Sequence, residues 1–385
     1  MKLYFSNLSE FITQSEIRNM SIECDRLGGI NMSQGICDMA LPPPVSHGAK
    51  AAMDHGHNHY TRYDGVLELR NAIAEKMVRF NRIPCDPEKN IIVSAGATGA
   101  LYSTCLALLD PGDEVILFEP YYGYHVSTLA AVGVRPVFVP LARPDWALDL
   151  DALERAVTPK TRAIIVCTPA NPSGKAFTAE EINALADFVL RHGMFVFTDE
   201  IYEYFLYEGR RHISPGSIER IADRTITISG YSKTFSITGW RIGYAVCHEK
   251  WSRMIGYVSD LVYVCAPAPL QFGVAEGILQ LGQDYYDELR NIYQRKRNVL
   301  CDTLSAIGLT PHVPDGAYYV LADVGHLVGA SAKDKAMFML KTTGVATVPG
   351  SAFFSGSGGN DLVRFCYAKD DQVIEEACQR LRTLL

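Results

Sequence analysis

The middle of the chain alternates short, β-rich apolar runs with longer helical stretches. The helical stretch TAEEINALADFVLRHG, for example, separates the run RAIIVCTPANP from MFVFTDE. Because strands that alternate with helices of this length usually join as parallel neighbours, the pattern predicts an α/β fold with a largely parallel sheet covered by helices. The predicted strands lie at residues 90–96, 114–120, 134–141, 162–172, 194–200 and 225–230.

Several of these runs end in polar residues. Asn171, Asp199 and Ser229 each come at or near the end of a predicted strand. In open α/β sheets, ligands bind beyond the carboxyl ends of the strands. We therefore expect the functional site at that edge of the sheet.

The chain is longer than a single hydrophobic core usually supports, since it has 385 residues, and two domains are expected. After the last predicted strand, the pattern changes to a long helical run, the segment PDGAYYVLADV, a helix near 331–343 and a closing strand LVRFCYA. This change indicates a smaller α+β domain, which the N-terminal segment joins up to the proline break at 42–44. The predicted division is a large domain at 46–284 and a small domain formed by 1–45 and 285–385.

Composition argues against several kinds of partner. Lys and Arg number 36 against 43 Asp and Glu, which gives a formal charge of −7, and no basic run is present. Such a surface does not suit nucleic-acid phosphates or an anionic membrane. The ten cysteines form no C-x-x-C pair, and the sequence has neither an apolar signal core nor an 18-residue apolar span. We expect no nucleic-acid or membrane partner, and a cytoplasmic location where thiols stay reduced.

Three local patterns offer candidate chemistry, and each has an ordinary structural alternative. Lys233 stands among small and aromatic residues; such a lysine is most often solvated, but a partly apolar pocket would favour the neutral amine that a nucleophile needs. Asp199 ends an apolar run, where a carboxylate either caps a helix or faces a ligand. The turn SAGATG is either a plain strand-to-helix turn or an anion site built from helix N–H groups. It matches neither dinucleotide nor P-loop motifs, and Arg241 would be the cationic partner of a phosphate there.

Together these segments resemble the class I and II aminotransferases, enzymes of fold type I that depend on pyridoxal 5′-phosphate. The family motif S-x-S-K-x-F-x-x-x-G-x-R-x-G is close to GYSKTFSITGWRIG, and TDEIY, PANPSG, GATGAL and EPYYGY occur in the family's order. The resemblance covers nearly the whole chain. It implies a large domain with a mostly parallel seven-stranded sheet, a smaller α+β domain and pyridoxal phosphate as cofactor.

The resemblance also implies a role for each matching residue. Lys233 would form the Schiff base with the cofactor, and Asp199 would keep its pyridine nitrogen protonated, so that the ring can act as an electron sink. Tyr202 would hold the ring hydroxyl. The remaining cofactor contacts would come from Ala97, Thr98 and Arg241 at the phosphate, from Asn171 at O3′ and from Tyr122 stacked on the ring.

Substrate and partner contacts are implied in the same way. Arg364 in LVRFCYA resembles the arginine that grips the substrate α-carboxylate, for which a bidentate guanidinium is suited. Gly35 in MSQG resembles a glycine whose backbone approaches the substrate beside Asn171. Tyr60 in HYTRYDG resembles a tyrosine that reaches the phosphate of a partner subunit. The protein is therefore expected to be a homodimer with shared active sites.

The sequence departs from the family pattern at the phosphate. Gly230 stands three residues before the lysine, where relatives hold a serine. The lost hydroxyl contact would have to come from Ser229 or Ser232, and we include Ser232 among the expected cofactor-binding residues.

A second departure concerns substrate choice. Relatives that prefer aspartate need another cation for the side-chain carboxylate, but Thr98 stands near where one branch has a lysine, and residues 254–289 contain no Lys or Arg. We therefore expect a neutral or aromatic substrate side chain. Candidate walls for it are Tyr63, Tyr121, Tyr122 and Tyr124.

Alternating histidines at 55, 57 and 59 could suggest a metal site, since such residues can converge on one face of a strand. They lie instead in a polar, glycine-containing stretch just before Tyr60. We expect no metal.

The expected reaction is a ping-pong transamination, in which an L-amino acid leaves as a 2-oxo acid and a second 2-oxo acid takes up the amino group. Lys233 would act as general acid and base. A C–S β-lyase or a cyclopropane-forming synthase would use the same residues and is the alternative. A non-catalytic sensing module is a third possibility, against which the intact Lys233, Asp199 and Arg364 count.

Overall fold

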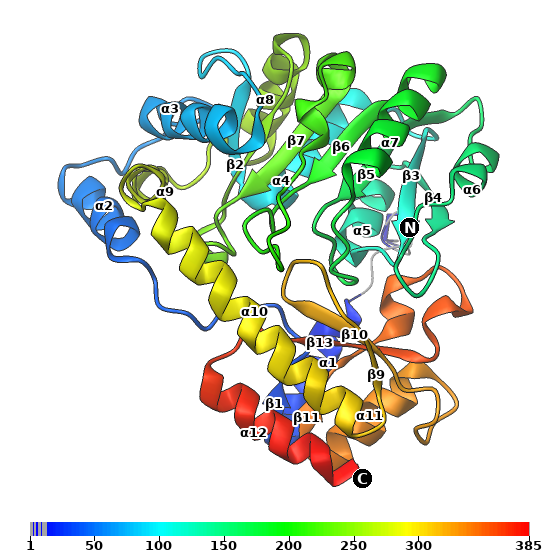
Figure 1. Ribbon diagram of the computed structural model, residues 1–385. Helices are drawn as coiled ribbons and strands as arrows, with labels where there is room; N and C mark the ends of the chain where they lie inside the picture. The colour runs from blue at the N-terminus through cyan, green and yellow to red at the C-terminus, as the bar shows by residue number, and fades with distance from the viewer. Residues whose placement is uncertain (1–2, 4, 7–8, 10–13, 385) are drawn as a thin grey trace.

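The computed structural model describes residues 3, 5–6, 9 and 14–384. Its largest element is a seven-stranded sheet of order β2-β8-β7-β6-β5-β3-β4 (Figure 1). Strand β8 runs antiparallel to β2 and β7, whereas the other neighbours pair in parallel, so the expected mostly parallel sheet is confirmed. The strands are β2 (Ile91–Ala95), β3 (Glu114–Glu119), β4 (Arg135–Pro140), β5 (Thr161–Cys167), β6 (Phe195–Asp199), β7 (Thr225–Gly230) and β8 (Ile242–Val246).

Helices cover both faces of this sheet. Ile165 and its neighbours on one face pack against a helix layer that includes Leu101 and Leu129, whereas Ile164 packs on the other face against Leu185. Adjacent strand residues thus enter opposite cores, as the two-residue period of a strand requires. The helices are α4 (Gly96–Leu108), α5 (Gly123–Ala131) and α8 (Glu249–Tyr263) on the first face, and α6 (Leu150–Arg155) and α7 (Ala179–His192) on the second.

Helix α7 shows how the sequence sets its own boundaries. Thr178 accepts a hydrogen bond from the Glu181 N–H, and the Glu181 carboxylate accepts one from the Thr178 N–H, which together form a capping box. The helix ends at Gly193, whose φ of 66° lies in the left-handed region that glycine adopts at little cost. Its apolar stripe faces the sheet and fixes the position of β6.

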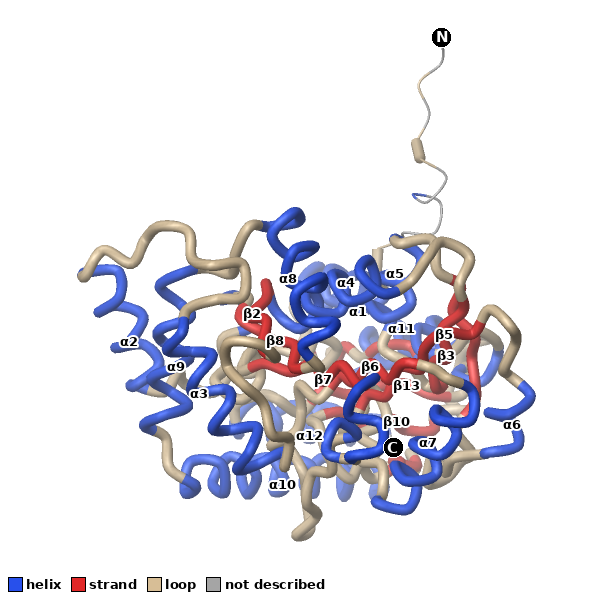
Figure 2. Tube along the Cα trace, turned by 90° about the horizontal axis from the view of Figure 1, so that it is seen from above, coloured by secondary structure: helices blue, strands red, loops and turns tan. Residues whose placement is uncertain are grey.

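A third helical group lies at one end of the large sheet. Figure 2 shows α2, α3 and α9 together there, and their apolar residues join the core cluster that continues into the smaller part of the molecule. They are α2 (Pro43–Asp54), α3 (Leu67–Lys76), which continues as a π-helical turn (Met77–Asn81), and α9 (Ala268–Gln280).

The smaller part is built around a four-stranded antiparallel sheet of order β12-β13-β10-β9. Helix α10 (Gln283–Ala306) runs from the large sheet down to it (Figure 1). A parallel pair, β1 with β11, ties the N-terminal segment to this side. The remaining elements are α1 (Glu16–Leu27), β1 (Ile30–Asn31), β9 (Thr310–His312), β10 (Tyr319–Asp323), α11 (Ala332–Thr343), β11 (Val345–Ala346), β12 (Val348–Pro349), β13 (Leu362–Cys366) and α12 (Asp371–Leu381).

The predicted domain boundary between residues 284 and 285 falls in the first turn of α10, and the division itself stays a prediction. The predicted small domain includes residues 1–2, 4, 7–8, 10–13 and 385, which lie outside the described residues. Short 3₁₀ turns complete the fold at Pro215–Ser217, Glu219–Arg224, Thr238–Trp240, Gly350–Phe353, Ser357–Gly359 and Arg382–Leu384.

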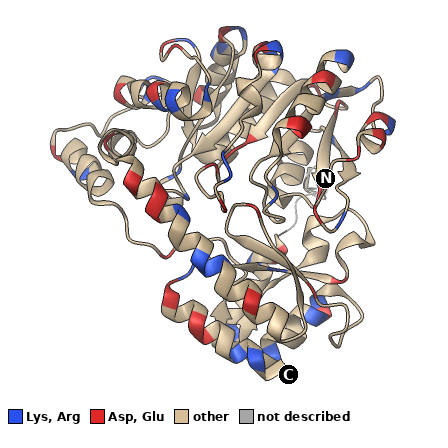
Figure 3. Ribbon diagram, viewed as in Figure 1, with Lys and Arg blue, Asp and Glu red and all other residues tan. Residues whose placement is uncertain are grey.

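Charged residues of both signs are intermixed along the outer helices, α10 among them (Figure 3). Among the described residues, no helix is both long and apolar enough to cross a membrane.

Candidate active site

A cavity of about 440 Å³ opens where strands β5, β6 and β7 end, and a smaller one of about 210 Å³ adjoins it. The two cavities share several lining residues, Lys233 among them, and they face the carboxyl ends of the parallel strands, as expected from the sequence. The predicted residues that line them are Gly35, Ala97, Thr98, Tyr122, Asn171, Asp199, Tyr202, Ser232, Lys233, Arg241 and Arg364. Tyr60 lines neither, and 83% of its surface is exposed.

Lys233 lies in the turn that follows β7, with its amine inside the cavity. Its Nζ donates a hydrogen bond to the Gly35 carbonyl oxygen at 3.1 Å. Burial lowers the pKa of the Lys233 amine below its ordinary value, which raises the neutral fraction at a given pH. Gly35 cannot carry a side chain, because a Cβ there would lie 1.9 Å from the Tyr319 hydroxyl oxygen. The Lys233 amine therefore lies beside the Gly35 backbone, which carries no side chain.

Asp199 is the last residue of β6 and lines the larger cavity. Its Oδ2 lies 2.8 Å from Nε2 of the buried His125 on α5, and its Oδ1 accepts the Ile201 N–H at 3.3 Å. The carboxylate begins no helix, so the capping alternative does not apply. Sequence reasoning missed His125, although it stands three residues after Tyr122 in EPYYGYH. Its imidazole fixes the orientation of the Asp199 carboxylate.

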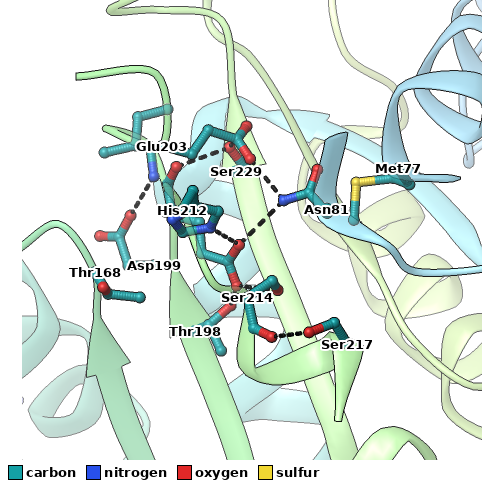
Figure 4. Close-up of polar contacts among 12 residues, drawn as sticks. Met77, Asn81, Thr168, Thr198, Asp199, Glu203, His212, Ser214, Ser217 and Ser229 are labelled. Carbon is teal, nitrogen blue, oxygen red and sulfur yellow. Dashed lines mark hydrogen bonds and ion pairs between the residues drawn. The ribbon is translucent and has the colours of Figure 1, made fainter. Parts of the chain in front are cut away.

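The segment from Asp199 to Glu203 sends its side chains to two different places. Asp199 and Tyr202 line the cavity, and the Tyr202 hydroxyl lies 3.0 Å from that of Tyr319. Glu200 and Glu203 turn away into a buried polar network, which Figure 4 shows converging on His212, Asn81 and Ser229. The network thus anchors the turn that presents Asp199 and Tyr202.

The carboxylates of this network are well paired, although the buried Asn81 Oδ1 has no partner among the described residues. Lys76 Nζ donates to Glu203 Oε1 at 2.6 Å, Asn81 donates to Glu203 Oε2 at 2.8 Å, and His212 Nε2 lies 2.6 Å from Glu200 Oε2. Glu200, Glu203 and His212 could in principle surround a metal ion. The Lys76 ammonium and the Asn81 amide already fill these carboxylate positions, so the cluster is explained as a buried ion-pair network.

We expect Glu203→Gln to destabilise the fold by about 3–5 kcal/mol, because it leaves the Lys76 amine buried without its counter-charge. Burial raises the pKa of the Glu203 carboxyl, but the charges of Lys76 and His212 outweigh it and hold that pKa below its ordinary value. The stabilisation by Glu203 is therefore complete above the unfolded-state pKa and is lost as pH falls through the folded-state value.

Urea unfolding at neutral pH, and again below pH about 4, measures both effects. Asp187→Asn, which removes a largely exposed partner of Arg220, is the matched control and should cost less than about 1 kcal/mol. If Glu203→Gln and Asp187→Asn lowered the free energy of unfolding equally, the buried network would not anchor the turn.

The start of helix α4 borders the same cavity and has the features of an anion site. Helix α4 begins at Gly96 directly after β2, and its N-cap residue Ala95 provides no side-chain hydrogen bond, which leaves the first-turn N–H groups near Ala97 and Thr98 free. A Cβ on Gly96 would lie 2.4 Å from Arg241 Nη2. A glycine therefore lets the guanidinium sit against the helix N-terminus.

The structure decides between the two serines proposed to replace the missing hydroxyl. Ser229 Oγ donates to Glu203 Oε1 at 2.9 Å in the buried network and does not line the cavity, so that expectation was wrong. Ser232 lines it. A side chain at Gly230 would meet the Gly243 Cα at 2.9 Å on the paired strand, which explains why a serine does not fit there.

Arg364 forms the floor of the smaller cavity and is fully buried. Its Nη1 donates to Asn171 Oδ1 at 2.8 Å and its Nη2 to the Ser33 carbonyl at 2.5 Å. Its Nε has no hydrogen-bond partner among the described residues. The guanidinium also lies over the Tyr319 ring, 4.2 Å from the centroid. A buried guanidinium without a carboxylate partner is suited to a substrate carboxylate.

Of the four tyrosines expected as walls, Tyr122 and Tyr124 line the cavity, and their rings stack with centroids 5.3 Å apart. The other two tyrosines do not line the cavities of their own chain. Tyr121 packs on Phe138, and Tyr63 packs on Tyr257, outside both cavities.

Comparison with known proteins decides the family. Residues 28–381 match the family described as Aminotransferase class I and II. The chain belongs to the class I and II aminotransferases. It is therefore a pyridoxal-phosphate-dependent aminotransferase, as the sequence motifs predicted, and the comparisons do not favour the lyase, the synthase or the sensing module.

Relatives of this aminotransferase differ in the substrates that their names specify. It is 33% identical to an aromatic-amino-acid aminotransferase from Thermococcus litoralis, over 99% of this chain and 98% of the relative. It is 34% identical to an aspartate aminotransferase from Pyrococcus abyssi, over 99% and 98%. The solved structure of N-succinyldiaminopimelate aminotransferase from Mycobacterium tuberculosis superimposes with a TM-score of 0.95 at 34% identity, covering 99% of this chain and all of the other.

The residues of this aminotransferase fit the cofactor that its family uses. The free N–H groups of α4 and the Arg241 guanidinium suit a phosphate, the Lys233 amine suits an aldehyde, and the Asp199 carboxylate suits a protonated ring nitrogen. All three line one cavity of about 440 Å³. The donor set thus matches the three chemically distinct ends of pyridoxal phosphate.

Proposed function

We propose that the cavity binds pyridoxal phosphate and transfers the amino group of a neutral or aromatic L-amino acid to a 2-oxo acid. The observation that supports this most is the convergence of Lys233, Asp199 and Arg364 on two adjoining cavities. When bound, the cofactor supplies an electron sink for the substrate Cα carbanion. The residues assigned to hold it are Lys233 at the aldehyde, Asp199 at the ring nitrogen, Tyr202 and Asn171 at O3′, Tyr122 on the ring face, and Ala97, Thr98, Ser232 and Arg241 at the phosphate.

Lys233 moves the proton in this proposal. Its amine, whose pKa is lowered by burial, would take the proton from the substrate Cα and would return it as the general acid of the transfer. Asp199 would face the ring nitrogen of the bound cofactor, and His125 Nε2 holds its Oδ2 at 2.8 Å. Burial raises the pKa of Tyr202 well above its ordinary value, so this phenol remains a neutral hydrogen-bonding group.

Arg364 orients the substrate. Its buried guanidinium binds the α-carboxylate, and Asn171 and the Gly35 backbone border the same space. This grip would place the Cα–H bond near Lys233 and the substrate side chain against Tyr124, since the Tyr122 ring is assigned to the cofactor. Aromatic faces favour apolar and aromatic side chains over a carboxylate that would lose its hydration there.

A panel of amino donors tests the proposal. With one fixed 2-oxo acid acceptor, kcat/KM for phenylalanine or methionine should exceed that for aspartate by at least about tenfold, because each apolar contact on the tyrosine walls discriminates by about 1–3 kcal/mol. Formation of the 2-oxo acid of each donor is measured. A higher kcat/KM for aspartate would contradict the donor preference, and release of pyruvate with ammonia would indicate a lyase.

We also propose a homodimer in which Tyr60 reaches the phosphate site of the partner subunit. Its 83% exposure and its absence from the cavities of its own chain support this arrangement. Mixing Tyr60→Phe with Lys233→Ala subunits should produce some hybrid sites that hold both wild-type residues and so regain activity. Full activity in a demonstrated monomer would contradict the shared site. The ten free cysteines support the proposed cytoplasmic location.

A further inference from the structure

A second phenol lies behind the tyrosine that the proposed function assigns to the cofactor. Tyr319 is the first residue of β10, it is buried, and its hydroxyl oxygen lies 3.0 Å from that of Tyr202. The two rings meet edge to face, with centroids 5.7 Å apart. Of the two cavities, Tyr202 lines both and Tyr319 lines the smaller one. Tyr319 can therefore act on the larger cavity through Tyr202.

The Tyr319 side chain is also held by two residues of the substrate site. A Cβ on Gly35 would lie 1.9 Å from the Tyr319 hydroxyl oxygen, so the glycine leaves the room that this hydroxyl occupies. The Arg364 guanidinium lies over the face of the Tyr319 ring, 4.2 Å from its centroid, in a cation–π contact. One side chain thus contacts both the arginine assigned to the substrate carboxylate and the tyrosine assigned to the cofactor.

The number of protons available sets the direction of the hydrogen bond between the two phenols. A phenol has one proton to donate and lone pairs that accept. If the Tyr202 proton is directed to the cofactor ring oxygen O3′, the contact of 3.0 Å must use the proton of Tyr319. Burial raises the pKa of Tyr319 above its ordinary value and outweighs the charge of Arg364, which lowers it, so Tyr319 keeps this proton. Burial also raises the pKa values of its neighbours Tyr318 and Cys366, which stay neutral.

We propose that Tyr319 is a positioning residue of the reaction: its hydroxyl donates to Tyr202 and thereby directs the Tyr202 O–H to the cofactor ring oxygen. This inference rests on the proposed function, because Tyr202 must face O3′. Hydrogen bonds in a chain polarise one another, so a phenol that accepts one donates a stronger one. Without the Tyr319 hydroxyl, the Tyr202 O–H can rotate away, and a negative charge on O3′ is less well stabilised.

The test removes the Tyr319 hydroxyl and keeps its ring, in holoenzyme that carries Tyr319→Phe. The visible absorption of the bound cofactor is titrated with pH. Because a hydrogen bond to a charged oxygen favours the deprotonated form, weakening it should move the midpoint of this titration upward by about 0.5–1 pH unit. We expect kcat to fall by about fivefold. KM for the amino donor should change by less than about twofold, because Arg364 keeps the aromatic face beneath it.

Tyr367→Phe is the matched control. Tyr367 is another fully buried tyrosine, its hydroxyl donates to that of Tyr207 at 3.2 Å, and the pair lies outside both cavities. Its replacement removes the same group and should leave the midpoint and kcat unchanged. A double-mutant cycle tests the route of the effect. In a Tyr202→Phe background, adding Tyr319→Phe should move the midpoint by less than about 0.2 pH unit.

Other outcomes overturn the inference. If Tyr319→Phe has the wild-type midpoint, Tyr319 does not orient Tyr202, even when kcat falls. If Tyr319→Phe shifts the midpoint equally with and without the Tyr202 hydroxyl, the effect does not pass through Tyr202. A shift of the same size in Tyr367→Phe would point to a general effect of losing a buried hydroxyl. Failure of the proposed function looks different, because wild type itself would then bind no pyridoxal phosphate, and both proposals would be wrong.

Discussion

Lys233→Ala should lower kcat by at least about 10⁴-fold, because it removes the group that carries the proton between substrate and cofactor. The variant should fold normally, since the lysine amine donates a single hydrogen bond, to the Gly35 carbonyl, and replacement by alanine leaves no buried charge. Single-turnover kinetics with saturating amino donor measures the loss directly. An added primary amine such as methylamine should restore part of the rate, because it supplies a base in the vacated space.

Lys50→Ala is the control, since this lysine is exposed on α2. It should retain wild-type kinetics. The visible absorption of the bound cofactor, which a bond to Lys233 would produce, should be altered in Lys233→Ala only. If Lys233→Ala kept more than one hundredth of wild-type kcat and an unchanged spectrum, Lys233 would neither transfer the proton nor bond to the cofactor.

Asp199→Asn should lower kcat by about 10³-fold, a loss on the scale of removing a preorganised electrostatic contact in an active site. Asparagine has nearly the same shape and can still contact His125, but it cannot keep a ring nitrogen protonated. The effect should therefore appear in kcat for every donor, with much smaller changes in KM. Steady-state kinetics over several donors measures this pattern.

Two matched variants isolate the role of the Asp199 charge. His125→Asn removes the neighbour 2.8 Å away and should cost less than Asp199→Asn, because the carboxylate remains. Asp187→Asn removes a surface carboxylate and should have no kinetic effect. If Asp199→Asn retained more than a tenth of wild-type kcat, the electrostatic role assigned to Asp199 would be wrong.

Most strands of the large sheet could be predicted because the sequence patterns that indicate a strand are local. Each parallel strand is a short apolar run bounded by polar residues, and the run at 225–230 coincides with β7. Strand β8 was not predicted. Its residues IGYAV follow Arg241 within a segment interpreted for its chemistry. Strand β8 pairs with β7, which directly precedes it, but its antiparallel pairing with β2 depends on contacts across more than a hundred residues of chain.

Prediction of the site residues has the same limit, because local motifs do not reveal contacts between distant parts of the chain. Lys233, Asp199 and Arg364 were predicted because each stands in a recognisable motif. His125 has no motif, and only the fold brings the start of α5 beside Asp199 at the edge of the sheet. The direction in which Ser229 points was equally hidden, because a strand residue faces either the cavity or the network depending on register.

The turn after β6 also constrains how this protein can change over evolutionary time. Side chains at 199 and 202 enter the cavity, and those at 200 and 203 enter the buried network. Substitution at one of these positions affects one side of the turn, but a change in length shifts both sets. A single-residue deletion before the turn would move Glu200 and Glu203 into the positions that face the cavity, whereas a single-residue insertion would move Asp199 and Tyr202 into the positions that face the network. We therefore expect functional descendants of this chain to vary in residue type around the turn and to keep its length unchanged.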